Sequence, residues 1–449
     1  MKTPKKNLAL LLAAVLVLTG ASGAFAGEAP RPVETPEDAL AWISALLGED
    51  PDAEAWLLTD QMKAAAAAAG GMKGLAASLA ALGTLSETGV PYEGTLQGYR
   101  VFYVPCVFSV MPIDLIVVTE QGAVAGLTTG PYTGNREQAA PSAAFDEIGL
   151  ALEVPSLGEL PGTLTVPKGE GPFPAVVLVH GSGPNDRDET LVGQKPFRDL
   201  AEGLAGKGIA VYRYDKRTYV YGARLQVDRG ITLMEETVED AAAAVRLLSL
   251  QDRIDPDRIF VLGHSLGGNA VPAIDRLLRA GDVPVRGYIL MAASPRPLNV
   301  LMREQAEYLY SLLPEITPEQ QAEKDALLRE LDRLEDPDVL TENDMIAGAW
   351  APYWKWLAAY DPLSAAAEIA VPCLLLQGEE DYQVTMTDFG IWKDAFGGSG
   401  NWRFISYPGL THAFTPGEKR EGSAAYARNE KVDARVIDDI AAFVLEAER

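Results

Sequence analysis

Short apolar runs alternate with amphipathic segments over about the last two thirds of the chain, residues 147–449, and this alternation constrains the fold more than any other feature. The segments Leu233–Leu250 and Val432–Leu445 have helical periodicity. Continuous apolar strands that alternate with helices are typical of a parallel sheet covered on both faces. The pattern therefore predicts an α/β fold. Its strand-like runs begin at Ala175, Ile209, Arg258, Tyr288 and Cys373.

Residues 295–360 interrupt this alternation. They contain a long charged helical pattern, Glu319–Leu334, and an aromatic patch, Trp350–Trp356. An insertion of this length between two core strands is more often a functional element than a plain connector. We expect it to form a helical cap over the active site.

The region before this domain, residues 31–130, has a different pattern. Thr35 has the character of a helix cap, and the alanine run 64–69 indicates a second helix. β-branched and aromatic runs then favour a small antiparallel sheet. We expect a small α+β accessory domain, joined to the next domain by a linker at residues 131–146. The strand-like runs are Tyr99–Val104 and Leu115–Thr119.

The N-terminus has the pattern of an export signal. Three lysines precede the apolar stretch Leu8–Leu18, and small residues end at Ala24–Ala26. The stretch is short for a membrane span, which needs about 20 apolar residues. We predict a signal peptide at residues 1–26, a secreted or extracytoplasmic product, and no stable membrane insertion after cleavage.

Charge and cysteine content exclude several classes of partner. With 63 acidic and 38 basic residues the formal net charge is −25, so nucleic acid is a poor partner because like charges repel phosphate. The two cysteines, Cys106 and Cys373, are too few for a disulfide framework or a cysteine metal site. Each lies in an apolar run, which predicts two separate buried thiols. The sequence does not determine an oligomeric state.

A candidate nucleophile follows the strand-like run 258–262. The residues Gly263-His264-Ser265-Leu266-Gly267-Gly268 come directly after it and lead into the apolar segment 270–278. In this strand–turn–helix context G-x-S-x-G is the nucleophile elbow, in which a sharp turn exposes the serine hydroxyl. The alternative is an ordinary glycine-rich turn.

A serine nucleophile needs a base, and the chain has three histidines. His264 lies within the elbow and cannot readily fold back onto its neighbour's hydroxyl, while His180 ends an early strand. His412 remains, in a loop after the strand-like run 403–407. We therefore predict that His412 is the general base.

The acid that orients the histidine should follow the strand that begins at Cys373. That loop contains three carboxylates, Glu379, Glu380 and Asp381. The residue types alone leave the three in competition, and a solvated acidic turn is the structural alternative.

Four motifs together resemble the α/β-hydrolase superfamily. They are H-G-S-G-P-N-D-R-D from His180, the G-H-S-L-G-G elbow, Q-G-E-E-D-Y-Q-V from Gln377, and L-T-H-A-F around His412. They are similar to those of secreted or cytosolic bacterial serine esterases grouped with serine aminopeptidase-like and dienelactone hydrolase-like enzymes. The accessory region also resembles small domains that precede secreted hydrolases.

This resemblance implies a site and a mechanism. The spacing G-x-x-D-x-x-V favours Asp381 as the orienting acid, with Glu380 as the alternative, and gives the α/β-hydrolase order of serine, acid and histidine. The H-G-x motif implies that the amide of Ser182 joins that of Leu266 in the oxyanion hole. We expect a small-molecule acyl ester as substrate, with no cofactor and no metal.

Two segments leave questions open. Tyr214–Tyr219 resembles the family's Y-D-x-R-G-x-G segment but lacks both glycines, so the loop there is expected to follow another path. The polar loop Asn185–Glu189 either binds a polar substrate group or forms a local salt bridge.

Three functions compete on these observations. The first is a carboxylic ester hydrolase with the triad Ser265, Asp381 and His412. The second is a peptidase or amidase of the serine aminopeptidase type, because the same triad cleaves amides. The third is a non-catalytic binding module, which usually lacks one triad member, whereas all three candidates are present here.

Overall fold

The computed structural model describes residues 30–48, 55–79, 82–96, 99–108, 112–131, 142–155 and 157–446. The chain divides into two compact units, of which the first ends at Gln138 and the second begins at Ala139. The predicted signal peptide and residues 132–141 of the predicted linker lie outside the described residues. Within the described ranges, no helix combines the length and apolarity needed to cross a membrane.

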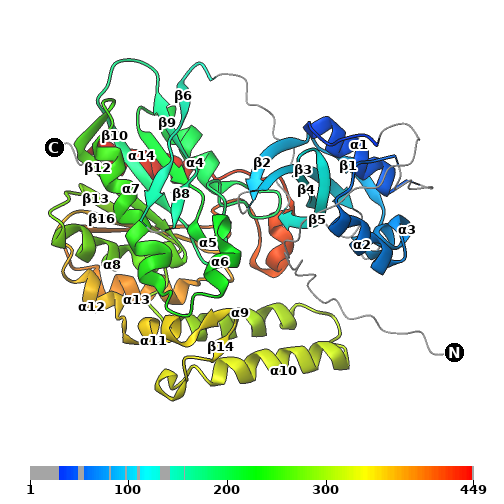
Figure 1. Ribbon diagram of the computed structural model, residues 1–449. Coiled ribbons are helices and arrows are strands. Elements are labelled where there is room, and N and C mark those ends of the chain that lie inside the picture. The colour runs from blue at the N-terminus through cyan, green and yellow to red at the C-terminus, as the bar shows by residue number, and fades with distance from the viewer. Residues whose placement is uncertain are drawn as a thin grey trace. The chain divides into compact units, whose positions relative to one another are not determined.

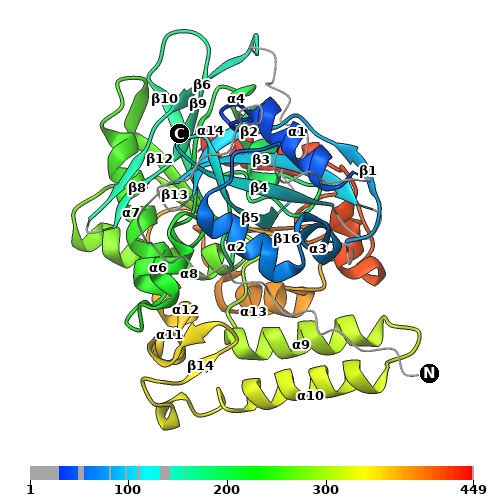
Figure 2. The same cartoon turned by 45° about the vertical axis from the view of Figure 1, so that its right-hand side comes forward.

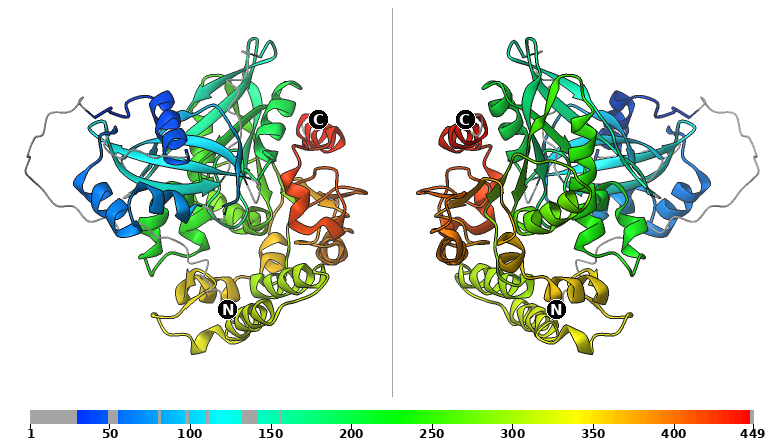
Figure 3. Two further views of the ribbon diagram at one scale, coloured as in Figure 1. Left: turned by 90° about the vertical axis from the view of Figure 1, so that its right-hand side faces the viewer. Right: turned by 90° about the vertical axis from the view of Figure 1, so that its left-hand side faces the viewer.

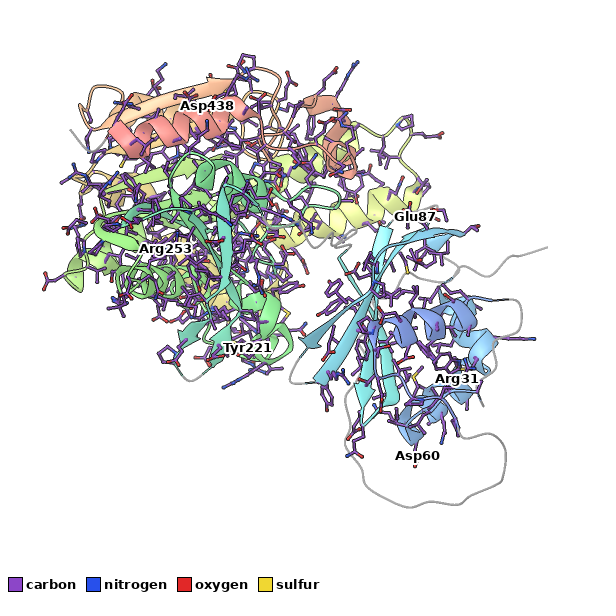
Figure 4. The ribbon with its side chains drawn as sticks, turned by 90° about the horizontal axis from the view of Figure 1, so that it is seen from above. Arg31, Asp60, Glu87, Tyr221, Arg253 and Asp438 are labelled. Carbon is purple, nitrogen blue, oxygen red and sulfur yellow. The ribbon has the colours of Figure 1, made fainter. Side chains whose placement is uncertain are left out.

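The first unit combines helices with an antiparallel sheet. A capping box at Thr35 starts the first helix, and Gly70, at a φ of 94°, ends the alanine-rich second one. In Figure 4 Asp60 marks the start of that second helix, and Glu87 lies in the first strand. The elements are α1 (Pro36–Leu46), α2 (Asp60–Ala69), α3 (Met72–Ser78), β1 (Leu85–Thr88), β2 (Tyr92–Leu96), β3 (Tyr99–Phe108), β4 (Pro112–Glu120) and β5 (Ala123–Pro131).

The sheet of the first unit has the order β1-β3-β4-β5, and β2 also pairs with β3. All of these pairings are antiparallel. Its core packs Trp42 of α1 against Phe102 and Leu115 of the sheet. Both cysteines of the chain are free and buried, Cys106 in this unit and Cys373 in the second, as the sequence predicts.

An eight-stranded sheet forms the centre of the second unit, in the order β17-β16-β13-β12-β10-β11-β9-β6 (Figure 1). Five of the seven pairings are parallel, while β9 pairs antiparallel with both β11 and β6. Its strands are β6 (Phe145–Gly149), β9 (Gly162–Pro167), β10 (Phe173–Val179), β11 (Ala210–Tyr214), β12 (Ile254–His264), β13 (Gly287–Met291), β16 (Cys373–Gly378) and β17 (Trp402–Tyr407). A separate hairpin pairs β7 (Leu152–Val154) with β8 (Gly158–Leu160).

The predicted α/β architecture is therefore confirmed, with one difference at its edge. β6 and β9 are strands that the sequence pattern did not predict, and β6 begins inside the predicted linker at Phe145. Residues 145–149 pair with 163–167, so a neighbouring strand supplies the hydrogen bonds. β5 likewise reaches Pro131 by pairing with β4.

Helices cover both faces of this sheet. Val177 and its alternate neighbours pack with α7, α8 and α13, while Val176 and its neighbours pack with α4 and α14. Figure 3 shows α14, in red, next to the C-terminal label, and Asp438 of this helix is labelled in Figure 4. The helices are α4 (Pro196–Ala205), α5 (Arg217–Val220), α6 (Gly222–Gln226), α7 (Glu239–Ser249), α8 (Leu266–Ala280), α12 (Pro362–Ala366), α13 (Met386–Phe396) and α14 (Ala434–Glu446).

The insertion between β13 and β16 is helical, as expected. Figure 1 and Figure 2 show two of its helices, α9 and α10, side by side. It has a small core of its own around Leu331, Ile346 and Trp354. Its elements are α9 (Leu298–Ser311), α10 (Pro318–Asp332), β14 (Met345–Ile346), β15 (Ala349–Trp350) and α11 (Ala351–Ala359).

The predicted helix Leu233–Leu250 differs from the structure at its start. Residues Met234–Val238 form a π-helical turn, and the α-helix α7 begins at Glu239. Such turns are rare and frequently lie at functional sites. Glu236 lies within this turn, and its carboxylate makes the contacts described below.

Candidate active site

Ser265 lies in a sharp turn between β12 and α8. Its backbone adopts φ 55° and ψ −118°, which L-residues rarely adopt, and its amide donates to the carbonyl of Met291 at 2.8 Å. A Cβ at Gly263 would lie 2.3 Å from the carbonyl oxygen of Gly267. A Cβ at Gly267 would lie 2.3 Å from the carbonyl oxygen of Val179. Both glycines are therefore needed for the strand, turn and helix to pack this closely.

His412 and Asp381 are in contact in the interior, with exposed fractions of 4% and 1%. Nδ1 of His412 donates to Oδ2 of Asp381 at 2.6 Å. Oδ1 of Asp381 accepts the amides of Gln383 and Val384 at 2.7 and 3.0 Å. The side-chain amide of Gln377 donates to Oδ2 at 3.2 Å. These donors fix the orientation in which the carboxylate faces the imidazole.

The other two carboxylates of this loop have different partners. Glu379 accepts a hydrogen bond from the hydroxyl of Ser406 at 2.8 Å. Glu380 accepts the backbone amide of Lys419, also at 2.8 Å. Among the three candidate acids, all of them described, Asp381 is the one that the structure brings to the histidine.

His264, which precedes Ser265, has a buried acidic partner that the sequence analysis did not identify. Its Nδ1 lies 2.8 Å from Oε2 of Glu189, as an ion pair outside hydrogen-bond alignment, and its Nε2 donates to the carbonyl of His412 at 2.9 Å. The other oxygen of Glu189 accepts the amide of Gly181 at 2.6 Å. Desolvation alone would lower the pKa of His264, but the Glu189 carboxylate outweighs it and holds that pKa above its ordinary value.

The loop after β10 lies beside the nucleophile. A Cβ at Gly181 would lie 3.1 Å from the Cβ of Ser265. The carbonyl of Gly181 accepts a hydrogen bond from Nζ of Lys216 at 2.8 Å. Ser182 and Leu266 line the same pocket as Ser265. Within the described part of the chain, no hydrogen bond uses the backbone amide of either residue.

The polar loop Asn185–Glu189 forms local contacts. The guanidinium of Arg187 donates to both carboxylate oxygens of Asp215, at 2.9 and 2.8 Å. His180 donates through Nε2 to the carbonyl of Asp186 at 3.1 Å, and burial lowers the pKa of His180 to about 4. Residues 186–189 are all described, and none of them lines the pocket. Of the two roles considered for this loop, the salt bridge is the one that the structure contains.

A pocket of about 1200 Å³ is formed between Ser265 and the cap. The core supplies Ser182, Ser265 and Leu266. The cap helices supply mainly apolar and aromatic side chains, which suits a ligand with an apolar group. The cap residues that line it include Leu298, Leu301, Met302, Trp350, Tyr353, Trp354 and Leu357.

Arg296 also lines this pocket, and the sequence analysis did not identify it. Its guanidinium donates to Asp388 at 2.8 and 2.9 Å and to Glu304 at 2.6 and 2.9 Å. Its charge is therefore neutralised by two carboxylates. No cluster of three or more His, Cys, Asp or Glu side chains suited to a metal ion occurs among the described residues.

Comparison with known proteins connects this geometry to a family. The family model described as Serine aminopeptidase, S33 matches residues 172–420, a segment that includes Ser265, Asp381 and His412. Esterase EstD of Thermotoga maritima is 37% identical over 358 residues, which cover 79% of this chain and 82% of that protein.

Solved esterase structures also match this chain, at low sequence identity. The thermostable carboxylesterase EstE1, from a metagenomic library, is 20% identical with a TM-score of 0.46, over 70% of this chain and 92% of that one. Est1E from Butyrivibrio proteoclasticus is 17% identical with a TM-score of 0.44, over 67% of this chain and 98% of that one.

Proposed function

Because this chain belongs to the serine aminopeptidase S33 family and is a hydrolase that acts on esters, we propose that it cleaves carboxylic esters through an acyl-enzyme on Ser265. The observation that carries the proposal is the 2.6 Å contact between His412 and Asp381, in a loop where the His412 carbonyl accepts a hydrogen bond from His264, the residue before Ser265. In this arrangement the imidazole has its Nδ1 proton held by a carboxylate, which leaves Nε2 free to act as a base.

Each group has a role in the acylation step. Nε2 of His412 takes the proton of the Ser265 hydroxyl while Oγ attacks the ester carbonyl and forms a tetrahedral intermediate. The imidazolium then gives that proton to the departing alkoxide, and the alcohol leaves. Asp381 holds the ring in one tautomer and stabilises its charged form throughout.

Deacylation repeats these steps with water. His412 removes a proton from the water, which attacks the acyl carbonyl, and then returns a proton to Oγ of Ser265 as the carboxylic acid leaves. The amides of Ser182 and Leu266 donate to the oxyanion in both tetrahedral intermediates. The step needs no redox partner, since one bond is hydrolysed and the serine is regenerated.

The pocket supports an acyl or aryl ester with an apolar group. The peptidase alternative requires a carboxylate that binds a free amino terminus. Of the three carboxylates that line the pocket, Glu236 pairs with Lys216 at 2.7 Å and Asp361 accepts a backbone amide of α12 at 3.0 Å. Glu335 is exposed. Two of the three are therefore occupied by the protein itself, which favours esters over peptides.

The test is the hydrolysis of p-nitrophenyl butyrate and of an aminoacyl-p-nitroanilide by the chain from Gly27 onward. We expect ester turnover that falls by about 10⁴-fold or more in Ser265→Ala, and little turnover of the anilide. Ser44→Ala, in α1 of the first unit, is the matched control and should retain the wild-type rate. Full activity of Ser265→Ala would refute the mechanism, and faster anilide cleavage would favour the peptidase.

We also propose that the protein is exported. The support is the charge and apolar pattern of residues 1–26, which ends in an A-x-A cleavage motif. Mass spectrometry of the protein from its native cells should give an N-terminus at Gly27. A product that retains residues 1–26 would contradict this proposal.

A further inference from the structure

Lys216 carries a buried positive charge next to the proposed oxyanion loop. The residue is 2% exposed and follows strand β11. Its Nζ donates to the carbonyl of Gly181 at 2.8 Å and lies 2.7 Å from Oε1 of Glu236. A buried ammonium group is unfavourable unless it has hydrogen-bond acceptors and a counter-charge, and here the Gly181 carbonyl supplies an acceptor and the Glu236 carboxylate supplies the counter-charge.

The carbonyl that Lys216 holds belongs to a particular peptide unit. The C=O of Gly181 and the N–H of Ser182 are the two ends of one planar trans peptide, so they point in opposite directions. Lys216 holds the carbonyl on the buried side. The amide of Ser182 therefore points away from Lys216, and Ser182 is an exposed residue of the pocket wall.

Two further contacts hold this loop. The amide of Gly181, which belongs to the preceding peptide unit, donates to Glu189 at 2.6 Å, and the side chain of Asn185 also donates to the Gly181 carbonyl, at 3.3 Å. An ammonium group on the carbonyl oxygen also polarises the peptide, which makes its N–H a stronger donor. Lys216 thus sets both the direction and the donor strength of this amide.

We propose that Lys216 is a positioning residue of the oxyanion hole, which holds the Gly181 carbonyl so that the Ser182 amide faces the acyl oxygen of the substrate. The inference rests on the proposed function, because it takes the Ser182 amide as an oxyanion donor. It also gives a role to the segment Tyr214–Tyr219, whose sequence departs from the family pattern.

The cap takes part in holding Lys216. The second oxygen of Glu236 accepts the hydroxyl of Tyr353 at 2.6 Å, and Tyr353 lies on cap helix α11 and lines the pocket. Burial raises the pKa of the Tyr353 hydroxyl well above its usual range, so the group remains a donor. A continuous polar chain therefore runs from the cap through Glu236 and Lys216 to the oxyanion peptide.

The test is steady-state kinetics of Lys216→Met on p-nitrophenyl butyrate, with inhibition by an alkyl trifluoromethyl ketone. Such a ketone forms a tetrahedral oxyanion adduct on the serine. We expect kcat to fall by about 10- to 100-fold, a part of the 10²–10³-fold loss typical of removing one oxyanion donor, with KM within about threefold. The inhibition constant of the ketone should rise by the same factor as kcat falls, and Lys216→Arg should recover part of both.

Arg217→Met is the matched control. Arg217 is the next residue, is 6% exposed, and forms a buried ion pair with Asp240 at 2.5 Å that lies outside the pocket lining. Its loss should lower the melting temperature while kcat and the inhibition constant stay within about twofold of wild type. A merely structural role for Lys216 would give this same result in Lys216→Met.

Ser265→Ala is measured in the same series to separate the two proposals. If Ser265→Ala is active, the proposed function fails. If it is inactive while folded Lys216→Met keeps wild-type kcat and ketone affinity, the role of Lys216 is overturned and the proposed function stands. If Lys216→Met does not fold, Lys216→Gln, which lacks the charge, is judged by the same two measurements.

Discussion

Nε2 of His264 donates a hydrogen bond to the backbone carbonyl of His412 at 2.9 Å, so the residue before the nucleophile holds the loop of the proposed base. Glu189 lies on the other side of His264 and also binds the Gly181 amide. The pair of Glu189 and His264 thereby connects the elbow, the oxyanion loop and the His412 loop. These contacts hold together three segments that are separate in sequence.

Removal of this acid should destabilise the second unit in a pH-dependent way. Glu189→Gln leaves His264 buried without its charge partner, which typically costs about 3–5 kcal/mol. The pKa of His264 is raised above its ordinary value of 6.5 in the folded protein. The stabilisation that His264 contributes is therefore complete below pH 6.5 and is lost as pH rises through the folded pKa. Burial alone would raise the pKa of the Glu189 carboxyl, but His264 outweighs burial and holds that pKa below its ordinary value of 4.5. The stabilisation that Glu189 contributes is therefore present above pH 4.5 and is lost at lower pH.

The difference in melting temperature between wild type and Glu189→Gln should therefore be largest between about pH 4.5 and 6.5 and should shrink at alkaline pH. Differential scanning calorimetry at pH 5.5 and pH 9 measures it. Glu323→Gln, at an exposed site on α10, is the control and should change neither value. A difference that is equal at both pH values would mean that the pair does not act through its charges.

Asp381→Asn should lower kcat by about 10³- to 10⁴-fold with little change in KM, because the amide supports the wrong imidazole tautomer. Glu380→Gln, at the neighbouring position whose carboxylate accepts the Lys419 amide, is the matched control and should keep its activity. Hydrolysis of p-nitrophenyl butyrate decides between the two acids. The reverse result would make Glu380 the orienting residue.

The apolar cap lining predicts a preference for longer acyl chains. Each buried methylene contributes about 0.8 kcal/mol, so KM should fall about fourfold per added carbon until the pocket is filled. Met302→Trp, on the pocket wall, should shift the optimum to shorter chains, whereas Ala322→Trp, at an exposed position on α10, should not. Kinetics on p-nitrophenyl esters from acetate to laurate measure the dependence on acyl chain length. A wild-type enzyme that prefers acetate to every longer ester would contradict this prediction.

Neither cysteine should react in the folded protein. Burial raises the pKa of the Cys106 thiol to about 12 and that of Cys373 further still, so almost no thiolate is present at neutral pH. A disulfide-exchange reagent such as DTNB should detect no thiol in native protein and two in urea. A signal from native protein would show an accessible thiol. The absence of a signal in urea without reductant would show a disulfide.

The sequence by itself determined the features whose causes are local. The glycines around Ser265 specify a tight turn, Thr35 specifies a helix start, and the apolar runs specify buried parallel strands. These patterns depend on residues within a few positions of one another, so they can be read without knowing the fold. The order of serine, acid and histidine followed in the same way from family resemblance.

Tertiary structure decided what depends on distant partners. Three carboxylates in one loop have similar sequence contexts, and only the path of the loop brings Asp381 to His412, 31 positions away. Glu189, in the loop after β10, meets His264 at the end of β12, and Lys216 meets the Gly181 carbonyl 35 positions away. The edge strand β6 and its neighbour β9 were missed for the same reason, because neighbouring strands supply their hydrogen bonds. Such contacts form between segments that only the packed sheet brings together, and no short-range pattern encodes them.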